Sequence, residues 1–174
     1  MAITRIGGAT AITGTIPQGN IANASLGAVT ALPGAIATGK VLQIQTHHFS
    51  SAVNITSTSF GDTGITKAIT PSATSSKILI TVALKLSTTG NSNERIMTQI
   101  LRGSSVIALN ERTLLSNNSA TQAMVGYQFL DSPSSSSELT YKIQWRCING
   151  ITVKLNDYEG TSSFSSLTLM EIGA

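Results

Sequence analysis

The chain has 174 residues, of which 41% are hydrophobic and only 11% are charged, and its formal net charge is +3. This length allows one domain of ordinary size with an appendage. Charged residues make up about 25% of an average soluble domain, and here the few Lys and Arg are scattered singly, so we expect no nucleic-acid partner and little attraction to anionic lipid.

Cys147 is the only cysteine, so an intramolecular disulfide is excluded and a place in the core is expected for it. No run of 18 apolar residues exists, which predicts that the chain has no transmembrane helix. The start, MAITRIGGATAITGTIPQG, is interrupted by Gly and Thr and does not read as a secretory signal. We therefore expect synthesis and folding in a cytoplasm.

Residues 1–40 form the first predicted segment. From Ile6 to Gly39 the sequence holds no charged side chain, while Gly, Pro and Asn recur every few residues. Disordered tails have the opposite composition, yet the broken periodicity prevents this segment from building a core of its own. We predict an extended arm that docks on, or entwines with, other chains through its apolar residues, namely Ile12, Ile16, Ile21, Leu26, Val29, Leu32 and Ile36.

From Val41 onward the sequence changes to short runs that alternate between apolar and polar residues, which indicates half-buried strands. In LTYKIQWRC the apolar residues from Leu139 to Cys147 alternate strictly with polar ones. The expected strands cover residues 41–49, 64–70, 77–87, 95–102, 105–110, 122–130, 139–148, 151–156 and 165–172.

Clusters of Ser, Asn, Gly and Pro separate these runs, and no helix is expected. Asn149-Gly150 between two alternating runs predicts a type I′ hairpin. The pattern favours an all-β fold, a jelly-roll-like antiparallel β-sandwich over residues 41–174. Its core is expected to include Phe60, Phe129, Tyr141 and Trp145. Residues 77–84 are apolar on both faces, which fits either a central strand or burial between subunits.

Few residues offer chemistry. His47 and His48 are adjacent in a strand and point to opposite faces, so a strand end is the preferred interpretation, with an ion on a trimer axis as the alternative. Asp157 and Glu159 are read as hairpin residues, and not as a glycosidase pair or a calcium loop. No GxSxG, Walker A, HExxH or GxGxxG motif appears. The sequence therefore predicts no enzyme, no metal site and no cofactor.

The segment GTIPQGNIANASLGAVTALPGAIATGKVLQ, followed by GITKAITPSATSSKILITV, resembles small tail-fibre and virion structural proteins of tailed bacteriophages, including cyanophages. The later phrases RGSSVI, FLDSPSSSSELTYKIQ and SSLTLMEI fit the same pattern. The resemblance covers nearly the whole chain and includes no catalytic motif.

This resemblance implies a homotrimer on the exterior of a phage particle. Residues 1–40 would attach to other tail or capsid proteins, and residues 41–174 would form a knob that binds the host, for which a surface glycan is the expected ligand. Candidate receptor-facing residues are Asn117, Asn118 and Tyr158. The alternative is a capsid decoration protein that stabilises the shell and binds no receptor. A secreted lectin-like sandwich and a glycan hydrolase rank below these two.

Overall fold

The computed structural model describes residues 40–88, 94–116, 121–158 and 161–173. The seven apolar residues named above as arm contacts lie outside these ranges, and so do Asn117 and Asn118. The predictions made for them stay predictions.

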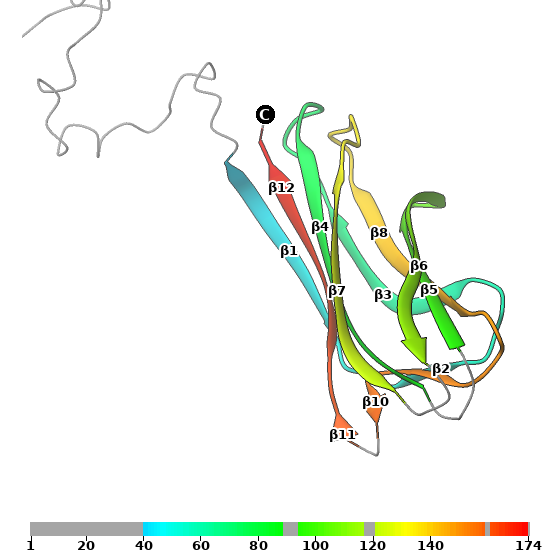
Figure 1. Ribbon diagram of the computed structural model, residues 1–174. Helices are drawn as coiled ribbons and strands as arrows, with labels where there is room; N and C mark the ends of the chain where they lie inside the picture. Colours follow the sequence, from blue (N-terminus) through cyan, green and yellow to red (C-terminus); the bar gives the residue numbers. More distant parts are fainter. Residues whose placement is uncertain (1–39, 89–93, 117–120, 159–160, 174) are drawn as a thin grey trace, which may run out of the picture. The chain divides into compact units, whose positions relative to one another are not determined.

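Two antiparallel sheets make up the described domain (Figure 1). In sheet A, strand β4 is flanked by β7 on one side, and by β12 and then the short β9 on the other. The outer positions beside β12 and β9 are taken by β1 and β2. The bounds are β1 (Val41–Phe49), β2 (Val53–Ile55), β4 (Lys77–Thr88), β7 (Gln122–Asp131), β9 (Val153–Leu155) and β12 (Ser165–Ile172).

Sheet B has four strands in the order β3-β8-β5-β6, so that β3 and β6 are its edges. A separate two-stranded ribbon, β10 with β11, projects between β9 and β12. The bounds are β3 (Gly61–Ile69), β5 (Glu94–Arg102), β6 (Ser105–Ser116), β8 (Leu139–Cys147), β10 (Asp157–Tyr158) and β11 (Thr161–Ser162).

The connectivity is that of a jelly roll. The eight long strands in chain order are β1, β3, β4, β5, β6, β7, β8 and β12. Counted in that order, sheet A joins the first, eighth, third and sixth strands, and sheet B joins the second, seventh, fourth and fifth. Neighbours within each sheet are thus drawn from both halves of the chain, as two Greek keys require. The predicted all-β, jelly-roll-like sandwich is confirmed.

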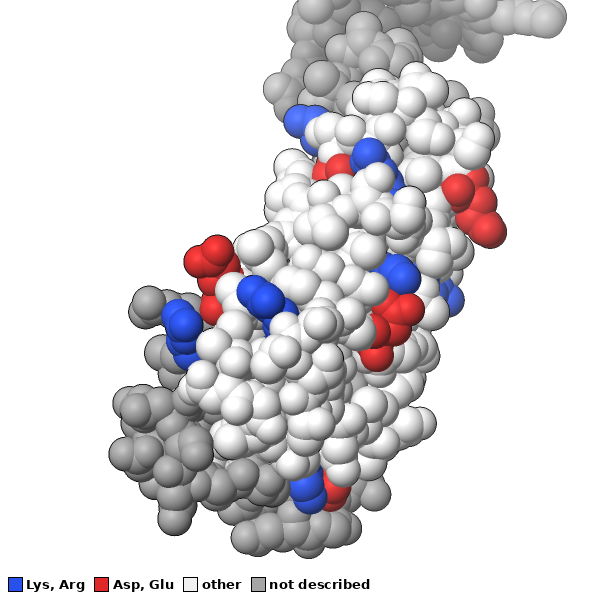
Figure 2. All heavy atoms as spheres, turned by 90° about the vertical axis from the view of Figure 1, so that its right-hand side faces the viewer, with Lys and Arg blue, Asp and Glu red and all other residues white. Residues whose placement is uncertain are grey.

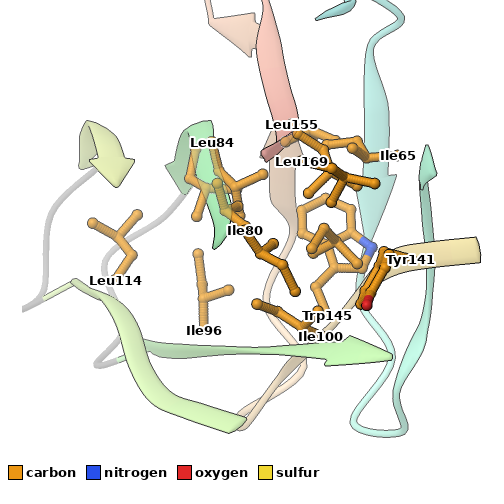
Figure 3. Close-up of a cluster of buried hydrophobic side chains, with 14 of the residues drawn as sticks. Ile65, Ile80, Leu84, Ile96, Ile100, Leu114, Tyr141, Trp145, Leu155 and Leu169 are labelled. Carbon is orange, nitrogen blue, oxygen red and sulfur yellow. The ribbon is translucent and has the colours of Figure 1, made fainter. Parts of the chain in front are cut away.

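The core lies between the sheets and is built from the inward residues of strands that alternate as the sequence predicts (Figure 3). Tyr141, Ile143, Trp145 and Cys147 follow one another along the inner side of β8 and are at most 1% exposed. Each fully buried side chain of this size contributes about 1.5–3 kcal/mol relative to exposure. Cys147 therefore acts as a core residue, as expected.

The position of strand β4 explains part of the apolar character of residues 77–84. The strand is interior to sheet A, with neighbours along both edges. Its inward residues Ile78, Ile80, Val82 and Leu84 are completely buried, whereas outward residues such as Leu79 are only half-buried. A central strand accounts for the inner apolar positions, and the outer ones lie on a surface.

Two expectations are wrong. Asn149-Gly150 does not close a hairpin, because β8 belongs to sheet B whereas β9 pairs with β2 and β4 in sheet A. Of the two turn residues, only Gly150 has a positive φ, of 74°, whereas a type I′ turn needs a positive φ at both, so that geometry is absent as well.

The second wrong expectation concerns the aromatic core. Phe60 is half-buried and lies outside the core cluster, and the guanidinium carbon of Arg146 lies 4.9 Å from its ring centroid. Phe129 packs against the core without being fully buried.

Buried carboxylates close the core at one end. Asp131 and Glu171 are both directly paired with Ile78, one from each side, and both are at most 7% exposed. Glu171 accepts hydrogen bonds from Gln43 Nε2 at 2.7 Å and from Ser72 N at 2.7 Å. These contacts fix the loop that joins β3 to β4 against the sandwich.

Candidate functional site

The domain has two distinct ends, and the chain enters at one of them. The carbonyl oxygen of Lys40 accepts a hydrogen bond from Gly173 N at 2.9 Å, and Val41 pairs with Ile172. The start of β1 and the carboxyl end of β12 therefore lie side by side (Figure 1). The chain therefore enters the described domain at this end, which we call the entry end.

The opposite end, which we call the far end, gathers connections from both halves of the chain. Thr88 N donates to Thr121 O at 2.8 Å, and Thr121 N donates to Thr88 Oγ1 at 3.1 Å. Ser87 Oγ donates to Asp157 O at 2.7 Å. The end of β4, the start of β7 and the β10–β11 ribbon thus meet here, away from Lys40 (Figure 1).

The predicted receptor-facing residues belong to connections that depart from this far end. Asn117 and Asn118 lie outside the described residues, but the flanking positions Ser116 and Thr121 are at the far end. Tyr158 is in β10, paired with Thr161, and its side chain is outside the described part. The described residues that flank positions 117 and 118, and the strand that contains Tyr158, therefore lie at the same end.

Asn156 fixes the ribbon that carries Tyr158, and sequence reasoning missed it. This residue is 2% exposed and adopts a left-handed backbone with φ of 58°, which Asn tolerates better than most residues. Its Nδ2 donates to Phe49 O at 2.7 Å and to Ser51 O at 3.3 Å, while Ser165 Oγ donates to its Oδ1 at 2.7 Å. The only sign of this role in the sequence is that an Asn, a residue that tolerates a left-handed backbone, ends the alternating run 151–156.

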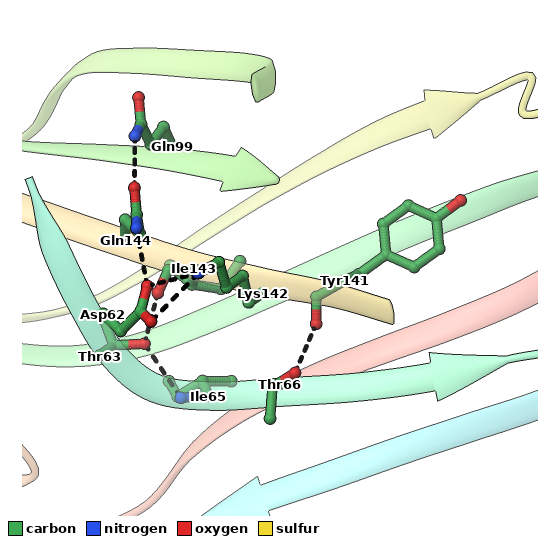
Figure 4. A network of polar contacts seen from close by, with 9 residues as sticks. All are labelled: Asp62, Thr63, Ile65, Thr66, Gln99, Tyr141, Lys142, Ile143 and Gln144. Carbon is green, nitrogen blue, oxygen red and sulfur yellow. Dashed lines mark hydrogen bonds and ion pairs between the residues drawn. The ribbon is translucent and has the colours of Figure 1, made fainter. Parts of the chain in front are cut away.

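A polar array crosses the outer face of sheet B (Figure 4). Gln99 Nε2 donates to Gln144 Oε1 at 2.6 Å, and Gln144 Nε2 donates to Asp62 Oδ1 at 2.7 Å. Lys142 Nζ lies 3.0 Å from Asp62 Oδ1 and 3.1 Å from Oδ2. Three neighbouring strands, β5, β8 and β3, supply these side chains in register.

The array stabilises the ionised form of its carboxylate. The amide of Gln144, and next the ammonium of Lys142, lower the pKa of Asp62 below its ordinary value. The carboxylate is 57% exposed, so solvent screens the pair and its contribution to stability is small. Both oxygens are already engaged by Lys142 and Gln144. The array is best explained as a polar ladder across an open sheet face.

Charge is sparse and balanced on the side of the domain that Figure 2 faces. Positive and negative side chains lie next to one another in small groups, separated by uncharged surface. Described ion pairs of this kind include Lys142 with Asp62 and Lys154 with Asp157. Such a surface presents no concentrated positive field for a polyanion.

The histidines point to opposite faces, as the sequence predicts. His47 is half-buried and its Nδ1 accepts a hydrogen bond from Thr66 N at 3.3 Å. His48 is exposed, with its ring 5.8 Å from that of Phe164 in an edge contact. Among the described residues, no group of three or more His, Cys, Asp or Glu could hold a metal ion within one copy.

Neither a protein-family model nor a curated protein matches this chain. Over the described residues, the structure has no helix that is long and apolar enough to cross a membrane.

Proposed function

We propose that this chain is a virion structural protein of a tailed bacteriophage, a short homotrimeric fibre. In this proposal residues 1–40 attach it to tail or capsid proteins, and residues 41–174 form a β-sandwich knob for host attachment, on the exterior of the particle. The observation that carries the proposal is the separation of the two ends of the domain. The arm is connected at the entry end, while the connections with the candidate receptor-facing residues leave from the far end.

This polarity suits an adhesive knob. An arm that is fixed to a particle at Lys40 would direct the far end outward, so that the segments near Ser116 and Tyr158 meet the host first. Connections at the end of a rigid sandwich can vary without disturbing the core, which is where recognition residues are usually found. Three copies side by side would multiply weak contacts into useful avidity.

The surface chemistry supports a glycan over a nucleic acid as the host ligand. Only 11% of the residues are charged, and Ser, Thr, Asn and Gln supply much of the polar surface. Neutral hydroxyl and amide groups hydrogen-bond to sugars, and salt screens such contacts little. The resemblance of the sequence to phage fibre proteins supports the virion role.

The test uses phage particles that lack this protein, to which the purified full chain or a chain without residues 1–38 is added. After density-gradient purification, we expect the full chain on the particles and the truncated chain in the unbound fraction. The thermal unfolding transition of the truncated chain is the control, because its sandwich contains every described core residue. Equal binding of both chains would contradict the docking role of the arm, and absence of both would contradict the virion role.

A second measurement separates the fibre from the capsid decoration alternative. The purified full chain is added to host cells before infection, and phage adsorption is counted. A host-attachment knob is expected to lower adsorption in proportion to its concentration. Unchanged adsorption, together with labelling of the capsid shell in electron micrographs, would favour the decoration role.

A further inference from the structure

The outer face of sheet A carries a row of large apolar side chains from edge to edge. Ile44, Met170, Leu79 and Leu130 pair successively across β1, β12, β4 and β7. Ile44 is 54% exposed and Leu130 is 49% exposed. Outward positions of a solvated sheet are normally polar, and a contiguous apolar row of this kind marks an interaction surface.

The next row is polar, but its hydrogen bonds are made within the sheet. It consists of Thr46, Thr168, Thr81 and Gln128. Thr46 Oγ1 lies 3.2 Å from Thr168 Oγ1, and Gln128 Nε2 donates to Thr81 Oγ1 at 3.3 Å. Covering polar groups that already have partners costs little. A sugar ligand would need free hydrogen-bond donors and acceptors, so this row suits an apolar protein surface better than a sugar.

The third row holds three small residues beside one histidine and contains no Lys, Arg, Asp or Glu. His48, Ser166, Ala83 and Gly126 pair across the same four strands. No charged side chain has to be desolvated over these three rows, a cost that often cancels the gain from contact. We call these three rows the sheet A face.

A second apolar surface lies around the β6–β7 edge of the sandwich. Val106 and Leu109 on β6 are 53% and 50% exposed. Met124 on β7 is 55% exposed and pairs with Lys85, so it lies on the outer side of sheet A, next to the third row. Between the two strands lies a shallow groove of about 240 Å³, lined by Ala108, Leu109, Asn110, Tyr127, Gln128 and Phe129. Each copy thus has both an apolar face and an apolar edge.

The size of the face favours a ring over a back-to-back pair. Four strands about 4.8 Å apart and three rows about 7 Å apart give a footprint of roughly 300–400 Å². A standard interface buries about 800 Å² per partner, so two sheet A faces that meet each other fall short. In a heterologous contact one copy's face receives the next copy's edge, so every copy uses two surfaces and the area buried per copy is about doubled. Such contacts form a ring when the rotation between copies closes.

We propose that the sheet A face of each copy is covered by the β6–β7 edge of a second copy. This inference rests on the homotrimer in the proposed function and specifies which surfaces hold it together. Residues from both sheets are then buried in the trimer, while the far end stays open to solvent.

The test measures the mass of the full chain by light scattering after size exclusion, for the unchanged chain and three variants. Thr81→Lys places a charge in the middle of the sheet A face, and Leu109→Glu places one on the β6–β7 edge. Each is expected to lower the mass about threefold, to one copy, with the β-rich circular dichroism spectrum unchanged. Thr140→Lys, at an exposed threonine on the outer face of sheet B, is the matched control and is expected to stay trimeric.

The double variant Thr81→Lys/Leu109→Glu tests whether the two surfaces meet each other. At low salt we expect it to be more trimeric than either single variant, because opposite charges then face each other across every contact. Thr168→Lys, in the same row, replaces Thr81→Lys should the latter be unfolded. A Leu109→Glu chain that stays trimeric, or a double variant no more trimeric than the singles, would overturn the proposal.

The mass measurements on the variants and the particle-binding assay test different proposals, so one can fail without the other. A trimer that the variants disperse as expected, but that does not bind particles, would leave the packing scheme intact and refute the virion role. Particle binding by a protein that is monomeric in the unchanged form would refute the homotrimer and the packing scheme, and would leave the docking role of residues 1–40 intact.

Discussion

Tyr141 Oη donates a hydrogen bond to Asp131 Oδ2 at 2.7 Å and so joins the two sheets of the sandwich across its entry end. Tyr141 comes from β8 of sheet B, and Asp131 from β7 of sheet A. Arg102 of β5 holds the same carboxylate at 2.8 and 3.0 Å. Burial, and then the neighbouring carboxylate, raise the pKa of Tyr141 well above its ordinary value, so the hydroxyl remains a donor.

Tyr141→Phe is expected to lower the free energy of unfolding by about 1.5–3 kcal/mol, because it removes a hydrogen bond to a buried charge. The matched comparison is Tyr127→Phe, which removes a neutral contact of 3.0 Å with Thr98 Oγ1 and should cost about 0.5–1.5 kcal/mol. Urea unfolding measures both. A smaller loss for Tyr141→Phe than for Tyr127→Phe would contradict the role given to this cross-sheet contact.

Glu171 predicts a dependence of stability on pH. Burial raises the pKa of this carboxyl, but the hydrogen bonds from Gln43 and Ser72 outweigh burial, and the pKa lies below its ordinary value of 4.5. The ionised form is therefore favoured by folding, so its stabilising effect is complete above pH 4.5 and is lost as the pH falls through the lower pKa of the folded state.

Glu171→Gln is accordingly expected to be less stable than the unchanged chain at pH 7, by about 1–3 kcal/mol. The difference should shrink as the pH falls below 4.5. Thermal unfolding from pH 3 to 7 measures it, with Glu138→Gln at an exposed position as the control. A difference that is constant with pH would argue against an ionised Glu171 in the folded protein.

Asn156→Asp is expected to show a pH dependence of stability opposite to the one that Glu171 confers. The substitution puts a carboxylate against the carbonyl oxygens of Phe49 and Ser51, which accept from the native amide. An unpaired buried charge costs about 3 kcal/mol or more, and protonation restores a donor. The pKa of the new carboxyl would be raised by folding, so this variant should recover stability as the pH is lowered. Loss of stability on acidification, as in the unchanged chain, would contradict this account of Asn156.

A comparison of Gly64→Ala with Gly103→Ala separates the cost of backbone strain from the cost of steric crowding. Both have positive φ, of 88° and 60°, so Ala costs about 1–2 kcal/mol at either position. A β carbon at Gly64 would also lie 3.0 Å from the ring of Phe49, whereas one at Gly103 would have no neighbour within 4 Å. Gly64→Ala should therefore lower the unfolding temperature more than Gly103→Ala. Equal losses would show that the ring of Phe49 moves aside freely.

Alternation in the sequence predicted the strands well where both faces of a strand differ clearly. The predicted range 41–49 and the observed β1 agree, and so do 165–172 and β12. Strand β6 extends to Ser116, beyond the predicted end at residue 110, because its alternation is interrupted by register shifts against β5. Alternation in the sequence shows which face of a strand is buried, and the extra residue at a bulge interrupts that alternation.

Pairing was harder to predict than strand positions. Asn149-Gly150 joins two runs that alternate, yet the runs belong to different sheets, because the connection crosses from one layer of the sandwich to the other. A turn signal specifies local backbone geometry and carries no information about which layer the next strand joins. In the same way, nothing in the sequence distinguishes Asp131 and Glu171 from the other carboxylates, since only the assembled sandwich brings Arg102, Tyr141, Gln43 and Ser72 to them.

The candidate surfaces were partly visible in the sequence. The two-sided apolar character of residues 77–84 left a central strand and burial between subunits as alternatives, and Leu79 lies in the apolar row of sheet A. The other members of that row, such as Ile44 and Leu130, come from strands far apart in sequence, so only the strand register reveals them together. The shared far-end location of the segments next to Asn117 and Tyr158 likewise follows from topology.

The mass of the unchanged full chain in solution tests the central claim most directly. Light scattering coupled to size exclusion should give close to three times 18.1 kDa, and the value should persist on dilution through the micromolar range. A single species of 18.1 kDa would contradict the homotrimer, and with it the packing of the sheet A face against the β6–β7 edge.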